Sequence, residues 1–145
     1  MLLSTIKFIY KITYTKDMRL EEHKEAFEIH KRAIFKWAIE VEGLEKSQRI
    51  VGLHASRGIL ELLSTMLHKK KIVDEGFQLN HRWFKSEKVL DKLPDFENKK
   101  EIISKIVKLE NLCEALSYGV QKPVNKTEEA IKLFRELEEM LNKAI

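Results

Sequence analysis

Apolar residues recur along most of this chain at steps of three, four or seven residues, the spacing of amphipathic helices. The first predicted helix spans residues 19–42, and Gly43 ends it, because glycine is common just past a helix. His23 and His30 continue the apolar stripe of this helix. The apolar members of the stripe are Leu20, Phe27, Ile34, Trp37 and Val41.

A second helix is predicted over residues 44–70, with apolar residues on two neighbouring faces. Small residues gather in one part of it, at Gly52, Ala55, Ser56 and Gly58. Small side chains let another backbone approach closely. We expect that neighbour to be either the first helix or a second subunit.

A short helix is predicted from Ser86 to Lys92, with Ser86 as its N-cap and Pro94 enforcing its end. A fourth helix is predicted over residues 97–118, where apolar residues recur at steps of four and three. The fifth begins near Asn125 or Thr127, where the spacing of an asparagine and a glutamate resembles a capping box.

The predicted fold is therefore all-α: an up-down bundle of about five helices, four of them long. Residues 19–145 form a single domain. Residues 1–18 form a short irregular or strand-like N-terminal arm, with one possible strand near residues 6–14. The alternative is that the natural chain starts at Met18 and that residues 1–17 are an upstream extension.

Composition narrows the function classes. The 145 residues are 43% hydrophobic and 34% charged, with a net charge of +4 that permits a nucleotide or RNA partner without demanding one. Because Cys113 is the one cysteine, an internal disulfide and a multi-cysteine zinc site are excluded, and a cytoplasmic location is expected. No cofactor or metal is expected, since no Gly-rich phosphate loop and no H-E-x-x-H motif is present. The apolar start of the chain is too short to span a bilayer, so no membrane partner is expected.

The histidines suggest three candidate sites. His23 and His30 lie two turns apart, about 10 Å, which is too far to bind one metal ion together. They either line a polar cleft or are partly buried and satisfied by hydrogen bonds. Arg49 and His54 form an Arg-x4-His pattern that can cleave RNA, but five helical residues turn their side chains apart by roughly 140°. We therefore interpret that match as chance.

The segment 80–85, with the sequence NHRWFK, is the third candidate site. It joins a histidine, two cations and two aromatic rings, a mixture that can contact phosphates and stack on bases. The alternative is that Trp83 and Phe84 cap the core while His81, Arg82 and Lys85 remain in water.

The order of these helices, with a His-bearing loop before the short one, resembles the HEPN family of small helical domains over roughly residues 19–143. The residues that carry the resemblance are the small-residue stretch 55–63, the loop 79–82, the segment 109–119 and the segment 128–134. The resemblance implies a homodimer whose cleft binds a nucleotide, RNA or a partner protein. It also implies a nucleotidyltransferase partner, in a toxin–antitoxin-like or stress-response module.

Many HEPN members are metal-independent RNases that carry an Arg, four to six residues, and then a His in their main helix. Here Tyr118 and Gly119 occupy the His-Gly position, none of residues 111–113 is arginine, and Glu114 stands where some members have an arginine three residues before a tyrosine. No catalytic residue is therefore assigned. The expected cleft is lined by Glu114, Tyr118, His81, Arg82 and Lys85. A non-catalytic binding protein is the first hypothesis. The alternatives are an RNase with a non-standard site built on His81, Arg82 and Tyr118, and a helical protein-interaction scaffold.

Overall fold

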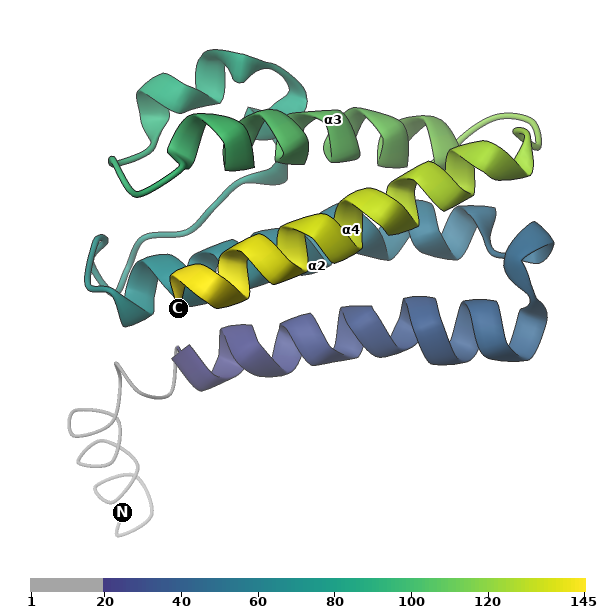
Figure 1. Cartoon of the computed structure of the whole chain (residues 1–145), viewed down its shortest axis with the longest axis horizontal. Helices are drawn as coiled ribbons and strands as arrows, with labels where there is room; N and C mark the ends of the chain where they lie inside the picture. Colours follow the sequence, from purple (N-terminus) through teal and green to yellow (C-terminus); the bar gives the residue numbers. More distant parts are fainter. Residues whose placement is uncertain (1–19) are drawn as a thin grey trace, which may run out of the picture.

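The computed structural model describes residues 20–145, and its regular elements are all helical, with no strand in that range. This confirms the predicted all-α bundle. Four long helices alternate in direction, so that neighbours along the chain run antiparallel (Figure 1). The N-terminal arm predicted for residues 1–18 lies outside the described residues.

Three long stretches of chain build the bundle around a central helix, α2 (Gln48–Lys69). Residues 20–32 are α-helical and continue directly into the π-helix η1 (Ala33–Glu42), and we call residues 20–42 the first helix. Helices α3 (Lys99–Ser117) and α4 (Val124–Ala144) complete the four. Short 3₁₀ turns connect them: η2 (Leu44–Lys46), η3 (His81–Lys85) and η4 (Glu87–Lys92).

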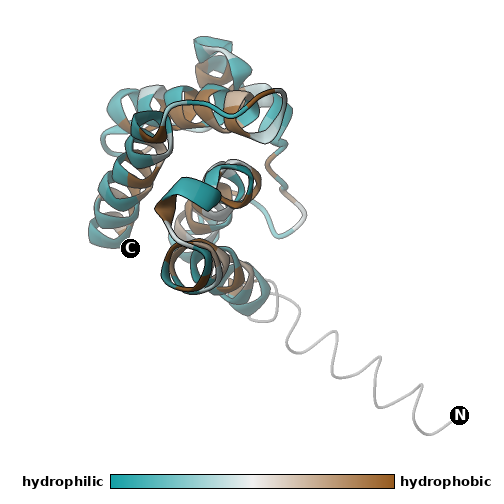
Figure 2. Ribbon diagram, turned by 90° about the vertical axis from the view of Figure 1, so that its right-hand side faces the viewer, coloured by the Kyte–Doolittle hydropathy of each residue, from teal (hydrophilic) through white to brown (hydrophobic). Residues whose placement is uncertain are grey.

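The core forms where α2 meets α3, α4 and the first helix. The buried apolar side chains gather at this centre. Hydrophobic and hydrophilic residues alternate along the ribbons of the long helices (Figure 2). Ile59, Leu63 and Met66 of α2 are almost completely buried, and each such side chain contributes roughly 1.5–3 kcal/mol. Of the helices in residues 20–145, α2 alone is long and apolar enough to cross a membrane. Because 72% of its most apolar stretch is buried inside the bundle, its position in the core accounts for that composition.

The small residues of α2 admit neighbours from within the same chain. A Cβ atom at Gly52 would lie 2.7 Å from Oγ and 2.9 Å from the backbone nitrogen of Ser117 on α3. One at Gly58 would lie 3.0 Å from Cβ of His30 and 3.3 Å from Phe134 on α4. The predicted contact with the first helix is thus confirmed at Gly58. The sequence did not indicate the other two neighbours, α3 and α4.

The apolar stripe predicted for the first helix holds in its N-terminal part and is wrong in its C-terminal part. Phe27 and Ile34 are buried, but Trp37 is 56% and Val41 62% exposed, and Ala38 is buried in their place. The reason is the π-helix, whose hydrogen bonds run over five residues, as from the Gly43 nitrogen to the Ala38 oxygen. The wider turn moves the inward positions away from the 3.6-residue spacing.

Helix ends follow the predictions with two corrections. The second helix, predicted from residue 44, begins only at Gln48, because the 3₁₀ turn η2 occupies Leu44–Lys46. The Ser86 hydroxyl accepts a hydrogen bond from the Lys88 nitrogen, which confirms Ser86 as the cap of the short helical segment. The predicted capping box at Asn125 is wrong, because α4 already begins at Val124 and Pro123 precedes it, with no side-chain cap. Proline suits this place, since the first turn of a helix has no use for its missing N–H.

Candidate functional site

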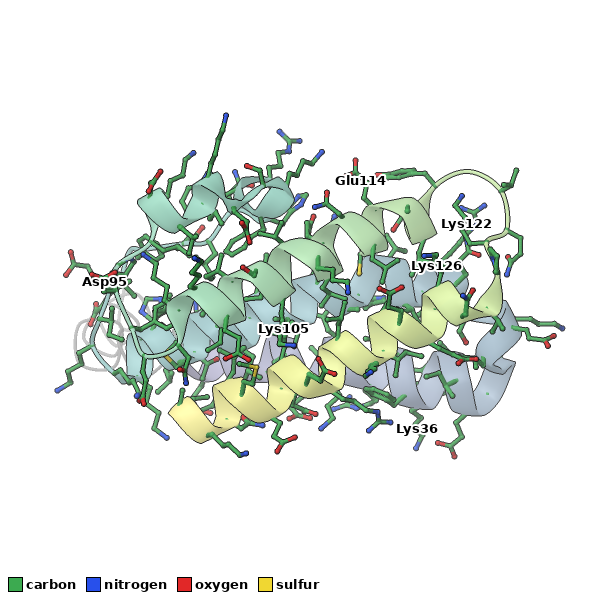
Figure 3. The ribbon with its side chains drawn as sticks, turned by 45° about the horizontal axis from the view of Figure 1, so that its top comes forward. Lys36, Asp95, Lys105, Glu114, Lys122 and Lys126 are labelled. Atoms are coloured by element: carbon green, nitrogen blue, oxygen red, sulfur yellow. The ribbon has the colours of Figure 1, made fainter. Side chains whose placement is uncertain are left out.

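All five residues predicted to line a cleft border the same cavity. Its volume is about 230 Å³, and it lies between the N-terminal half of α2, the turn η3 and the C-terminal half of α3. η3 contributes the three basic side chains, and α3 and its end contribute the other two; Figure 3 shows Glu114 projecting from α3 away from the bundle. The five residues are His81, Arg82, Lys85, Glu114 and Tyr118.

Local contacts fix η3 against α3. The Asn80 carboxamide oxygen accepts from the Arg82 nitrogen at 2.9 Å, which starts the turn. Phe84 points inward and is fully buried, so it anchors the segment in the core. The Asn111 amide of α3 donates to the Lys85 carbonyl at 3.1 Å. The basic side chains therefore extend from a turn that is held at both ends.

A histidine and a buried carboxylate form the central pair of the cavity. His81 Nδ1 lies 3.2 Å from Glu110 Oε1, and because an ionised carboxylate only accepts, Nδ1 is the donor. The Glu110 side chain is 9% exposed, and its Oε2 is buried without a hydrogen-bond partner in residues 20–145. This arrangement fixes the imidazole tautomer and leaves Nε2 as the proton acceptor or donor of the ring.

The charges that face solvent at the cavity are mainly positive. Lys85 pairs with Glu114 at 3.3 Å, so these two charges largely offset each other. The guanidinium groups of Arg57 and Arg82 make no ion pair or hydrogen bond with any side chain of residues 20–145. Two unpaired guanidinium groups beside one buried carboxylate create a local preference for an anionic ligand, above all a phosphate.

The floor of the cavity is formed partly by Cys113 and Ser56, both buried. Burial raises the pKa of the Cys113 thiol to about 12, although hydrogen bonds from Ser56 oppose the rise. The thiol is therefore protonated near neutral pH and does not serve as a nucleophile. This leaves proton transfer and anion binding as the chemistry that the side chains around the cavity can supply.

Tyr118 stands at the rim, 71% exposed, at the end of α3. Its hydroxyl makes no hydrogen bond with another side chain or backbone group within the described chain. Within residues 20–145, Tyr118 therefore neither packs into the bundle nor hydrogen-bonds at the helix end. An exposed ring beside unpaired guanidinium groups offers a surface on which a base can stack.

The other predicted sites lie elsewhere. Arg49 donates to the carbonyls of Ser117 and Gly119 at 2.8 and 2.6 Å, whereas His54 contacts His30 on the opposite side, so the Arg-x4-His match is not a site. Trp83 does not line the cavity. It packs against Phe77 and lies under Lys92, whose Nζ is 5.3 Å from the ring centroid.

Sequence analysis missed Glu110 and Arg57. Glu110 precedes Glu114 by four residues and Ser117 by seven, and this helical spacing places all three on the face of α3 that lines the cavity. The sequence shows this spacing, but it does not show that Glu110 is buried, because a glutamate in a charged helix is ordinarily exposed. Nothing in the sequence indicated Arg57, because its place depends on how closely α3 approaches the small residues of α2.

Within residues 20–145, no group of three or more histidine, cysteine, aspartate or glutamate side chains is arranged to hold a metal ion. No family model matches the chain, and no curated protein or solved structure is significantly similar to it. The chemistry of the cavity is therefore the basis for a functional proposal.

Proposed function

We propose that the cavity between α2, η3 and α3 binds a phosphate-bearing ligand, a nucleotide or a single-stranded RNA, and that this binding is the function of the domain. The unpaired guanidinium groups of Arg57 and Arg82, which lie on two different elements and border one cavity, carry the proposal. Guanidinium groups bind phosphate oxygens through two parallel hydrogen bonds, which is a geometry that lysine does not offer.

The aromatic ring of Tyr118 supports a ligand that includes a base. It is exposed at the rim, and base stacking on an aromatic ring contributes roughly 1–3 kcal/mol without requiring one particular base. The volume of about 230 Å³ is below the usual range for drug-sized ligands, so the cavity holds one nucleotide unit rather than a long segment. A longer strand extends from it over the surface.

Binding is tested with fluorescein-labelled single-stranded RNA of mixed sequence and with AMP as the small ligand. Arg57→Gln and Arg82→Gln are each expected to weaken binding about tenfold, because each removes a charge-assisted contact of at least about 1.5 kcal/mol. Arg32→Gln is the matched control, since Arg32 is exposed on the first helix and does not border the cavity. Equal losses in all three variants, or no salt-dependent binding at all, would contradict the proposal.

The resemblance to HEPN domains points in the same direction. It adds a nucleotidyltransferase partner and a toxin–antitoxin-like or stress-response setting to the proposal. The test of this setting is whether a nucleotidyltransferase gene lies beside the gene for this chain. It also adds a homodimer. Because Gly52 and Gly58 already contact α3, α4 and the first helix, a second copy needs another surface. The exposed apolar side chains of Ile29, Trp37 and Val41 on the first helix offer one.

RNA cleavage is a second candidate function, and the His81–Glu110 pair favours it. In this hypothesis, His81 Nε2 takes the proton of the 2′-hydroxyl while the 2′-oxygen attacks the adjacent phosphorus atom. The bond to the 5′-oxygen breaks, water protonates that oxygen, and a 2′,3′-cyclic phosphate remains. Arg57 and Arg82 stabilise the charge on the phosphate oxygens. Glu110 acts only as a positioning residue.

Cleavage and binding are separated by His81→Gln. If the domain only binds, this variant keeps the affinity for RNA within a few-fold, and neither protein cleaves. If the domain cleaves, an activity that co-purifies with the wild-type protein falls at least about 100-fold in the variant. A cyclic-phosphate product end distinguishes this reaction from nucleases in which water attacks the phosphate. The loss in His81→Gln distinguishes it from a contaminating RNase that uses the same attack.

A further inference from the structure

Four of the five histidines of the chain lie in one seam between the first helix and α2. His23 Nδ1 donates to Glu61 Oε2 at 2.6 Å, and its ring stacks on His68 with 5.3 Å between centroids. One step further along, His30 and His54 meet directly. We call these five residues the histidine seam: His23, His30, His54, Glu61 and His68.

The seam repeats because both helices carry its residues seven positions apart. His23 and His30 follow this spacing on the first helix, and His54, Glu61 and His68 follow it on α2. Seven residues are two helical turns, so each helix keeps these side chains on one face, about 10 Å apart. Antiparallel packing then matches His30 with His54 and His23 with Glu61.

The His30–His54 hydrogen bond is lost only when both rings are protonated. The two Nδ1 atoms are 2.9 Å apart, so one nitrogen donates and the other accepts. An accepting nitrogen has to be unprotonated, and hence at most one of the two imidazoles carries a charge while the hydrogen bond is made. Protonation of both rings replaces the bond with two opposed donors and two like charges.

The surroundings of this pair favour its uncharged state. Burial lowers the pKa of His30, the neighbouring His54 lowers it further, Glu61 raises it, and Arg57 lowers it. Burial also lowers the pKa of His54, and Arg57 adds to that effect. Glu138 is the acidic group that α4 brings to this part of the first helix, and it is engaged by Lys31 at 2.6 Å.

The two rings are partly buried, and the backbone of α2 limits the room on one side of His30. A Cβ atom at Gly58 would lie only 3.0 Å from the Cβ of His30, so the backbone of α2 runs close beneath this side chain. On that side, repulsion between the rings is relieved by moving the first helix away from α2. This links the protonation of two side chains to the docking of one helix.

We propose that the histidine seam is a pH-sensitive latch that holds the first helix on α2 at neutral pH and loosens it when both His30 and His54 take up a proton. The latch does not require the ligand proposed for the cavity. The His23–Glu61 contact opposes it, because protonation of His23 strengthens that pair while Glu61 remains ionised. Acidification therefore loosens the His30–His54 end of the seam first.

The direction of the pH effect follows from linkage. Histidines whose pKa is lower in the folded protein than the ordinary 6.5 stabilise the folded state fully above that value. The stabilisation is lost as the pH falls from 6.5 toward the folded-state pKa, by up to about tenfold in the opening equilibrium per pH unit for each proton.

Hydrogen exchange resolved along the chain tests the latch in the full-length protein. Between about pH 7.5 and about pH 5.5, protection factors in residues 20–42 are expected to fall about tenfold or more, while those of α3 change little. Glu61→Gln removes the opposing contact and is expected to enlarge this fall. His81→Gln changes a histidine outside the seam and is the control that keeps it.

The decisive comparison uses the variants His30→Gln and His54→Gln. If one of them fails to fold, the other still provides the test. Each replaces a titrating ring with a side chain that still accepts or donates a hydrogen bond. A fall in protection that is confined to residues 20–42 and disappears in these variants supports the latch. A fall shared equally by α3, or one that persists in both variants, would overturn it.

Discussion

His81 Nδ1 lies 3.2 Å from Oε1 of Glu110, whose other carboxylate oxygen is buried without a partner in residues 20–145. A buried charge with one hydrogen bond costs free energy relative to the same group in water. The cost is tolerable where the group fixes another side chain, and here the fixed side chain is the imidazole at the mouth of the cavity. Glu110 thus orients the imidazole of His81 at a cost in folding stability.

Glu110→Gln separates these two effects. We expect the variant to be neutral or more stable by up to about 1 kcal/mol at neutral pH, because it removes a buried, half-satisfied charge while keeping the shape of the side chain. Urea unfolding followed by circular dichroism measures this change. Glu114→Gln is the control, since Glu114 is half exposed in its pair with Lys85 and is worth less than about 0.5 kcal/mol. A loss above about 1 kcal/mol in Glu110→Gln would show that the charge itself stabilises the fold.

Gly52 of α2 and Gly76 in the loop after it are expected to differ sharply in their tolerance of alanine. At Gly52 the new methyl group meets backbone atoms of Ser117 and Cys113 at 2.9 and 3.0 Å, and we expect a loss of about 1–3 kcal/mol. Gly76→Ala is the matched control, because nothing lies within 4 Å of a methyl group there. Thermal unfolding of both variants makes the comparison, and equal melting temperatures would contradict the close approach of α3 to α2.

Sequence pattern was sufficient for the fold because helix periodicity and breaker residues act locally. The short helix at Ser86, the long α3 and the turn at Gly43 all followed from such signals. The pattern failed at Trp37, because nothing in a 3.6-residue repeat announces a π-helix. It failed at Asn125 because α4 already begins at Val124, directly after Pro123.

For a related reason, only part of the candidate site could be predicted from the sequence. Residue type drew attention to the loop around His81 and to Tyr118, and these do border one cavity. Glu110 and Arg57 belong there through tertiary contacts, which depend on the distance between α2 and α3 rather than on any local motif. The histidine pairs of the seam were likewise expected only as satisfied polar groups, without their partners.

Cys113 is expected to be chemically silent in the folded protein. Burial and a pKa of about 12 keep its thiol protonated, so a thiol reagent such as DTNB should react at neutral pH only through opening of the fold. The reaction is followed by absorbance in buffer and in denaturant, where this single cysteine should titrate as one equivalent. Rapid reaction in buffer would mean that α3 opens readily beside the cavity.

The exposed apolar residues of the first helix provide a test of the proposed homodimer. If Ile29, Trp37 and Val41 cover one another across a two-fold axis, Trp37→Glu buries a charge at the contact and should give a monomer by light scattering at micromolar concentration. Val120→Glu is the control, because Val120 is 77% exposed and belongs to the turn after α3 rather than to the first helix. A wild-type monomer, or a dimer that survives Trp37→Glu, would rule out this surface.

Arg57 connects the two parts of the molecule, since it borders the cavity and also lowers the pKa of His54. A phosphate bound by Arg57 brings negative charge toward that histidine, so the pKa of His54 should rise when the cavity is filled. By linkage, the affinity for phosphate should increase as the pH falls through the pKa of His54. NMR titration of the imidazole signals with and without AMP measures the first effect, and binding at two pH values measures the second. In Arg57→Gln, the pKa of free His54 should be higher than in the wild type, and AMP should no longer change it. A pKa of His54 that ignores AMP in the wild type, while binding itself is intact, would place the phosphate on Arg82 alone.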